Sequence, residues 1–97
     1  MSKSETQAIG YSDTLIMPTV LVFQGLDVRI YTNDHRPAHV HVVGRGCEAK
    51  FQLHCPDGPV EVVENFGFSR REMRQMLEAL QAAVEYLCQE WRRIHGI

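Results

Sequence analysis

The sequence predicts an α+β domain, built as an antiparallel meander of four strands, or five if a short further segment also pairs. Two patterns indicate this fold. Between residues 19 and 53, strand-like segments are separated by the two-residue turns Gln24-Gly25 and Arg45-Gly46; Thr19 to Phe23 is a β-branched and apolar run, and His39 to Val42 alternates polar and apolar residues. After residue 69, apolar residues recur every three or four positions, which is the period of a helix. One long C-terminal amphipathic helix is therefore expected to pack on one face of the sheet.

The chain has 97 residues and a formal net charge of -2. This length fits one domain, and we assign residues 17–97 to it and residues 1–16 to a flexible N-terminal arm. No apolar run approaches the roughly 18–20 residues that cross a bilayer, so we expect no membrane contact and a cytoplasmic location. The three cysteines, Cys47, Cys55 and Cys88, are odd in number and widely spaced, which predicts free thiols instead of a disulfide framework.

The first predicted hairpin starts at Met17-Pro18 and turns at Gln24-Gly25, where glycine supplies a positive φ. Pairing Phe23 with Leu26 places the apolar residues of both strands on one face. A slip of one residue would send the second strand's apolar set to the other side. The opposite face then carries Val20, Val22, Asp27, Arg29 and Tyr31.

The most unusual stretch is Asn33 to Val42, which holds three of the five histidines. Pro37 predicts a turn over residues 33–37 and a strand that begins near Ala38. His39 and His41 then point to the same side, away from the core.

The second predicted hairpin turns at Arg45-Gly46, so that His41 faces Lys50 and His39 faces Gln52. Its polar face gathers six residues, which are His39, His41, Glu48, Lys50, Gln52 and His54. Residues 55–59 form a turn, and Val60 to Val63 are the segment that would add a fifth, edge strand.

The helix is expected to begin at a capping box formed by Ser69 and Glu72, with Phe68 and Met73 as a hydrophobic staple. Its apolar stripe continues to Gly96. A helix of this length spans on the order of 40 Å, whereas the strands span about 20 Å. We therefore expect the stripe to outrun the sheet and to be covered by the N-terminal arm or, preferably, by a second copy in a homodimer.

The polar face suggests a metal-independent ribonuclease that needs no cofactor. His39 and His41 would share the roles of acid and base, and Lys50 would stabilise the phosphorane charge. Single-stranded RNA suits an open sheet face. The residues expected to hold the substrate are His35, Arg36, Arg29, Tyr31 and Gln52.

Two other uses of these residues are open. His35, His39 and His41 would form a divalent-metal site, completed by Asp34 or His54, although Lys50 would repel a cation. Asp34 or Glu48 would alternatively orient a histidine. The third reading is a non-catalytic module that binds a partner protein through the helix stripe and an exposed strand edge. The plainest reading is a solvated sheet face.

Four segments together resemble one bacterial family, and they are Met17–Val20, Tyr31–Val42, Glu48–Phe51 and Glu64–Glu72. The string Asp-His-x-Pro-x-His-Val-His is the most specific part. The pattern is similar to the domain-of-unknown-function family numbered 4160, over about Met17 to Gly96. The resemblance implies no settled biochemical role. It does imply an association with small toxin–antitoxin operons, and thus a cognate small protein from the same operon as partner.

Overall fold

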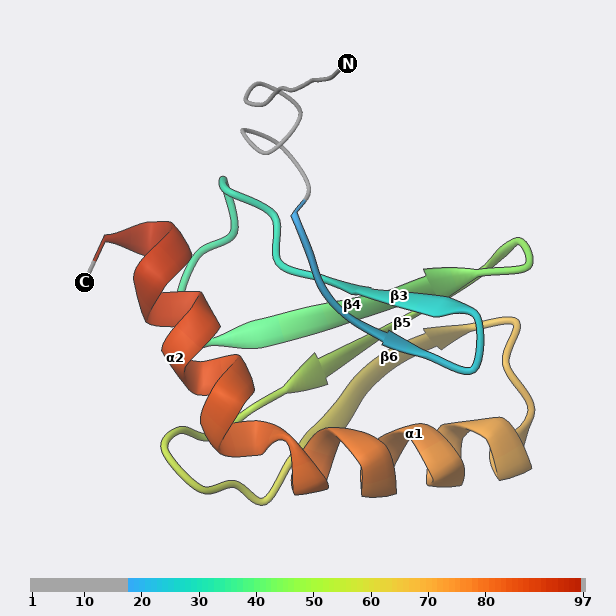
Figure 1. Ribbon diagram of the computed structural model, residues 1–97. Coiled ribbons are helices and arrows are strands. Elements are labelled where there is room, and N and C mark those ends of the chain that lie inside the picture. The colour runs from blue at the N-terminus through green and yellow to red at the C-terminus, as the bar shows by residue number, and fades with distance from the viewer. Residues whose placement is uncertain (1–17, 97) are drawn as a thin grey trace, which may run out of the picture.

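The computed structural model describes residues 18–96, which form a five-stranded antiparallel sheet followed by two helices (Figure 1). Each strand pairs with its neighbour in the sequence, so the order β2-β3-β4-β5-β6 is the predicted meander with its fifth strand present. The predicted arm, residues 1–16, lies outside the described residues. The elements are β2 (Thr19–Phe23), β3 (Leu26–Arg29), β4 (His39–Gly44), β5 (Cys47–Gln52), β6 (Glu61–Phe66), α1 (Arg70–Ala82) and α2 (Val84–His95).

The second hairpin has the predicted register throughout, and the first keeps it from Phe23 to Leu21, beyond which a bulge places Thr19 opposite Arg29. Phe23 pairs with Leu26, and the β4–β5 ladder runs from His39 opposite Gln52 to Gly44 opposite Cys47. The two turn residues of each hairpin have positive φ, which matches the right-handed twist of the flanking strands. The turn chemistry therefore fixes which residues face each other across β4 and β5.

The edge strand β6 covers Glu61–Phe66 and is longer than the predicted segment of residues 60–63. Its register against β5 shifts between Lys50 and Phe51, so Val63 is an extra residue opposite the ladder. All six residues of β6 are exposed, and the strand ends the sheet with one unpaired edge.

The core lies between one sheet face and the helices, as predicted. The buried strand residues alternate along β3, β4 and β5, and α1 contributes three buried side chains. Ser69 and Glu72 form the predicted capping box. The core is made of Leu26, Val28, Ile30, Val40, Val42, Ala49, Phe51, Leu53, Val60, Phe68, Met73, Met76, Leu80, Val84, Leu87, Cys88 and Trp91.

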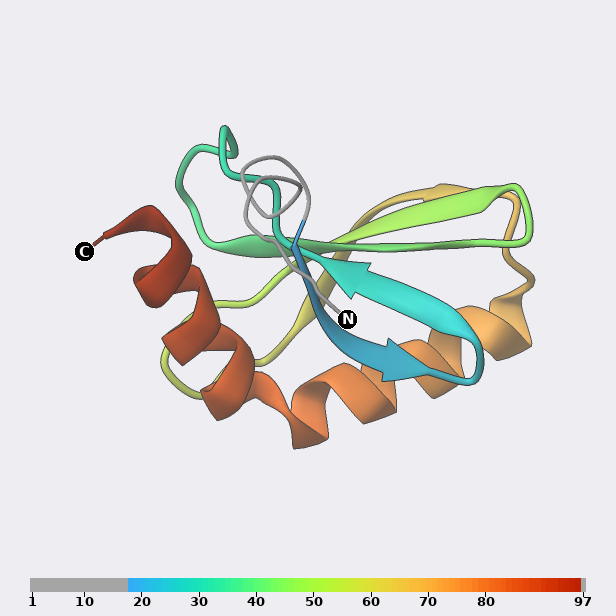
Figure 2. The same ribbon diagram turned by 45° about the horizontal axis from the view of Figure 1, so that its top comes forward.

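The prediction of one long helix is wrong, because the chain breaks at Ala83 into α1 and α2. Ala83 has φ -107° and ψ 11°, and its N–H donates to the carbonyls of Leu80 and Gln81. Figure 1 shows α1 running along one face of the sheet and α2 rising past the end at which β4 begins, and Figure 2 shows the same bend from a second direction. No glycine or proline marks the break, so helix propensity alone did not predict it.

This bend lets the apolar stripe be covered within one chain. Leu80 and Leu87 are fully buried, and Trp91 is only 3% exposed. The argument that the stripe outruns its sheet is therefore wrong, while the homodimer itself stays a prediction. Over residues 18–96, the helices are also too short and too polar to cross a bilayer.

The expectation of free thiols is wrong for two of the three cysteines. Cys55 and Cys88 form a disulfide that joins the turn after β5 to α2, and Cys47 is free. Gln81 holds the same turn against the helices, because it accepts from the Val60 N–H at 2.8 Å and donates to the Asp57 carbonyl at 3.1 Å. The two cysteines are 33 residues apart, so only the bent helix brings them together, and no spacing rule predicts the pair.

Candidate functional site

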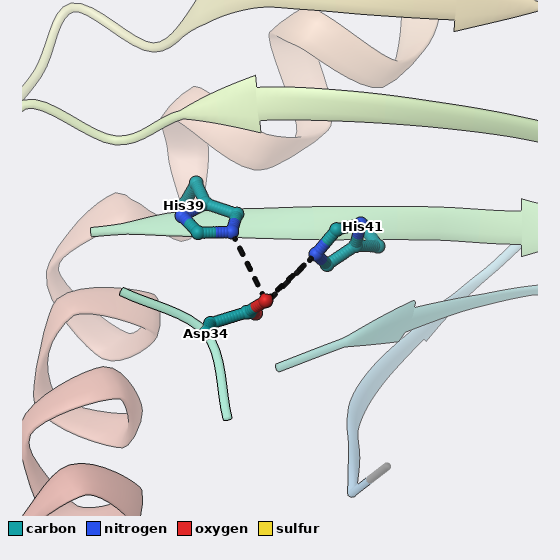
Figure 3. A group of neighbouring side chains, drawn as sticks. All are labelled: Asp34, His39 and His41. Atoms are coloured by element: carbon teal, nitrogen blue, oxygen red, sulfur yellow. Dashed lines mark hydrogen bonds and ion pairs between the residues drawn. The ribbon is translucent and has the colours of Figure 1, made fainter. Parts of the chain in front are cut away.

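The candidate site lies where β4 begins and is formed by Asp34, His39 and His41. Figure 3 shows the Asp34 carboxylate between the two imidazoles, which project from β4. The His39 Nε2 atom lies 3.3 Å from Oδ1 of Asp34, and the His41 Nε2 atom lies 3.3 Å from Oδ2. The exposed fraction of the side chain is 9% for His39, 12% for His41 and 11% for Asp34. The cluster is therefore largely shielded from water.

A tight turn in the β3–β4 loop holds the Asp34 carboxylate in place. The Asp34 N–H donates to the Tyr31 carbonyl at 3.0 Å, and the Tyr31 N–H donates to Oδ2 of Asp34 at 3.1 Å. Asp side chains commonly bond neighbouring backbone in this way. The loop therefore presents the carboxylate to β4 with little freedom.

The outer nitrogens of both rings have partners of their own. Nδ1 of His39 lies 2.9 Å from the Pro37 carbonyl oxygen, which can only accept, so this nitrogen is the donor. Nδ1 of His41 lies 3.3 Å from the Glu48 carboxylate. The Pro37 contact places a hydrogen on Nδ1 of His39, so its Nε2 can offer a lone pair to a cation. Both nitrogens of His41 face a carboxylate at 3.3 Å.

Two aromatic rings enclose the cluster. Tyr31 stacks on His41 with centroids 4.3 Å apart, and Trp91 of α2 packs on His39 at 5.3 Å. The expectation that His39 is displayed on an open face is therefore wrong, since this residue is only 7% exposed. The register is as predicted, but the loop and the bent α2 cover the end of that face.

A hollow of about 590 Å³ adjoins the cluster and collects most of the other predicted site residues. Lys50 and Gln52 line it from β5, where they stand opposite His41 and His39. Its lining residues are Tyr31, Asn33, Asp34, His35, Arg36, Pro37, His39, Lys50, Gln52 and Val63.

Arg29 does not join this hollow. Its guanidinium donates to the Asp27 carboxylate at 3.0 Å, and this hydrogen bond raises the pKa of Arg29 above its ordinary value. The register places Arg29 opposite His41, on the side of β4 away from Lys50. Arg29 therefore lies next to Tyr31 and His41 but does not line the hollow with His35, Arg36 and Gln52.

The cluster has the donor set of a metal site, although its composition differs from the predicted one. One ligand atom each from Asp34, His39 and His41 lies within 4.8 Å of the others. Ligand atoms about 2.1 Å from a tetrahedral metal lie roughly 3.4 Å apart, close to the 3.3 Å between each Nε2 and the carboxylate. His35 is exposed and is not part of this group. Asp34 is the third member of the group in place of His35, and it was predicted as a further possible ligand.

Two contributions to the site were not predicted from the sequence. The Pro37 carbonyl orients His39, and only the loop conformation brings it within reach. Trp91 covers the same ring from 52 positions further along the chain, and its place in the helix stripe predicted a core residue only. Neither has a local sequence signal. Glu48 was predicted as an orienting group, and it does lie beside His41.

Comparison with known proteins gives one match. A family model described as "Domain of unknown function (DUF4160)" matches residues 25–92, which include the whole cluster and the β4–β5 hairpin. The chain matches no curated protein and no solved structure. The predicted resemblance is confirmed, and the chain belongs to the DUF4160 family, a domain of unknown function.

Proposed function

We propose that this domain binds one divalent transition-metal ion through Asp34, His39 and His41. The observation that carries the proposal is the direction of the ring nitrogens. Both Nε2 atoms approach the same carboxylate at 3.3 Å, while both Nδ1 atoms face other acceptors. Two ring nitrogens and a carboxylate thus converge on one point, and a cation between them would satisfy all three groups.

The surroundings of the cluster support the same proposal. Metal-binding histidines commonly donate their second ring nitrogen to a carbonyl or carboxylate, and here Pro37 and Glu48 provide one of each. Two histidines with one carboxylate suit zinc and iron(II). Such a site keeps at least one coordination position for water or substrate, which is the arrangement of catalytic metal centres.

The geometry supports a metal better than the predicted acid–base pair. A general acid or base needs a ring nitrogen within hydrogen-bond reach of the substrate. Within residues 18–96, both nitrogens of each imidazole already face a protein group, and Trp91 and the loop cover His39. A metal-independent ribonuclease would have to break these contacts first.

Metal binding can be tested by titrating chelator-treated protein with Zn²⁺ in a calorimeter. We expect one ion per chain. Asp34→Asn and His41→Gln should each weaken binding by at least about 100-fold, because each removes one of three ligands from a site where even outer contacts contribute 10- to 100-fold. Glu48→Gln should weaken binding by about tenfold.

Two histidines outside the cluster serve as matched controls. His35→Gln tests the ligand that the sequence favoured, and His54→Gln removes an exposed imidazole paired with Glu61. Both should leave zinc affinity within about twofold. Equal zinc affinity in Asp34→Asn, His41→Gln and the two controls would refute the proposed site.

The other elements of the predicted function stay predictions. They are action on RNA within a toxin–antitoxin-type module, a cognate small protein, a homodimer and a cytoplasmic location. The Cys55–Cys88 disulfide weighs against the last, because disulfides are rare in the reducing cytosol. Ribonuclease assays with and without a chelator would test action on RNA, since the metal proposal predicts that any cleavage is lost when zinc is removed.

A further inference from the structure

The hollow beside the cluster is lined by a concentration of positive charge. Lys50 enters it from β5, and Arg36 and His35 enter it from the β3–β4 loop. Among the described residues that line it, Asp34 is the one acidic residue, and its carboxylate already faces the two imidazoles. The hollow therefore has two cationic side chains, Lys50 and Arg36, and one carboxylate, Asp34, which is turned towards the imidazoles.

These cations are also uncommitted within the described part of the chain. Over residues 18–96, Lys50, Arg36 and His35 form no hydrogen bond or ion pair through their side chains. Arg29, Arg45 and Arg93 each pair with a neighbouring carboxylate, whereas Arg70, Arg71, Arg74 and Arg92 also have no such partner among the described residues. Lys50 and Arg36 differ from those four because both line the hollow beside the cluster, together with the His35 imidazole.

The plainer explanation for Lys50 is a cross-strand pair on the surface. Glu64 stands opposite Lys50 in the β5–β6 register. The two make no ion pair, however, and at the bulge Val63 lines the hollow instead of Glu64. The extra residue in β6 thus contributes an apolar side chain to the wall that Lys50 also lines, and Glu64 does not line it.

We propose that this hollow binds the phosphate group of a phosphate monoester, against Lys50 and Arg36, with Asn33 and Gln52 as further hydrogen-bond donors. Two cationic side chains match the charge of about -2 that a monoester carries at neutral pH. Arginine and lysine are the side chains that bind phosphate best. A volume of about 590 Å³ lies in the usual range for small-molecule sites, which is roughly 300–1,000 Å³.

The position of the hollow relates this ligand to the proposed metal. Asp34 and His39 belong both to its wall and to the metal cluster, so an anion in the hollow lies next to the open coordination position. This part of the inference rests on the proposed function, whereas the contacts with Lys50 and Arg36 do not. The two are separable by experiment because the cations are present with or without metal.

The test measures phosphate binding to the full chain, first treated with a chelator and then loaded with Zn²⁺. The probes are inorganic phosphate, AMP, and a six-nucleotide RNA without terminal phosphates. In metal-free protein, Lys50→Gln should weaken binding of phosphate and AMP roughly 10- to 100-fold, as expected for loss of a hydrogen bond to a charged group. Lys50→Arg should restore most of it. The matched control is Arg71→Gln, which removes one charge from the first turn of α1, at the far end of the sheet (Figure 1).

The outcomes separate the two proposals. Tighter AMP binding after zinc loading supports both, whereas Lys50-dependent binding that zinc does not change supports the phosphate site and refutes its link to the metal. Equal affinity of Lys50→Gln, Arg71→Gln and the unchanged protein would overturn the phosphate site. Binding of the unphosphorylated RNA as tight as AMP would overturn the choice of a monoester, because a diester backbone would then be the ligand.

Discussion

Removal of the Cys55–Cys88 bond should destabilise the domain strongly. We choose Cys55→Ser because Cys55 is exposed, so the substitution removes the bond without opening a cavity, and buried Cys88 keeps its packing. The bond closes a loop across 33 positions and ties α2 to the turn after β5. Trp91 stands three residues beyond Cys88 on α2 and packs on His39, so the same bond supports the cover of the Asp34, His39 and His41 cluster.

The expected magnitude follows from the length of that loop. Closing a loop with a sequence separation of 33 lowers the entropy of the unfolded chain by an amount equivalent to roughly 3.5–4 kcal/mol at 25 °C. For a domain of this size, each kcal/mol shifts the unfolding midpoint by about 4–8 °C. Cys55→Ser should therefore unfold about 15–30 °C below the unchanged oxidised protein.

Thermal unfolding followed by circular dichroism measures this difference, with and without dithiothreitol. The reductant should lower the midpoint of the unchanged protein to nearly that of Cys55→Ser and should not affect the variant. Cys47→Ser is the matched control, since Cys47 is the free cysteine, and it should behave like the unchanged protein. A midpoint that neither the reductant nor Cys55→Ser alters would refute the reasoning.

Three smaller predictions concern the helix start and one turn. Ser69→Ala should cost about 1 kcal/mol in urea unfolding, because the hydroxyl accepts the Glu72 N–H in the capping box. The hydrogen bond from the Ser69 backbone lowers the pKa of Glu72. Its stabilising effect is therefore complete above the pKa of an unfolded-chain glutamate, about 4.3, and is lost as pH falls below this value and through the folded pKa. Glu72→Gln should flatten the pH dependence in that window, and an unchanged acid-unfolding curve would contradict this. Gly67→Ala should lower the free energy of unfolding by more than about 1 kcal/mol, because Gly67 has φ +104° and a Cβ there would lie 2.8 Å from Sγ of Cys47. Gly25→Ala is the control: Gly25 also has a positive φ, but a Cβ there meets nothing within 4 Å, so this variant measures the backbone strain without the contact.

The sheet was predictable because its register depends on local signals. Gln24-Gly25 and Arg45-Gly46 fix the turns, and strand alternation then fixes the pairs, including His41 opposite Lys50. The break at Ala83 was not predictable in this way. A continuous apolar stripe is compatible with a straight or a bent helix, and only the end of the sheet decides where the helix turns.

The site was predictable in its members more than in its arrangement. The His-x-His spacing placed His39 and His41 side by side, and the turn at Pro37 placed Asp34 near them. The sequence did not show which ring nitrogens would converge, because that depends on the Pro37 carbonyl and on Trp91. The sequence predicted two imidazoles on an open face, whereas long-range packing encloses them in a cluster with Asp34.

The exposed edge strand β6 also bears on solubility. Its outer backbone groups are a template on which another chain could extend the sheet, and Val62, Val63 and Phe66 would make such growth favourable. Glu61 and Glu64 place two negative charges along this short strand, and the bulge at Val63 distorts its pleat. Charge repulsion and irregular geometry together protect the folded domain from aggregation through this edge.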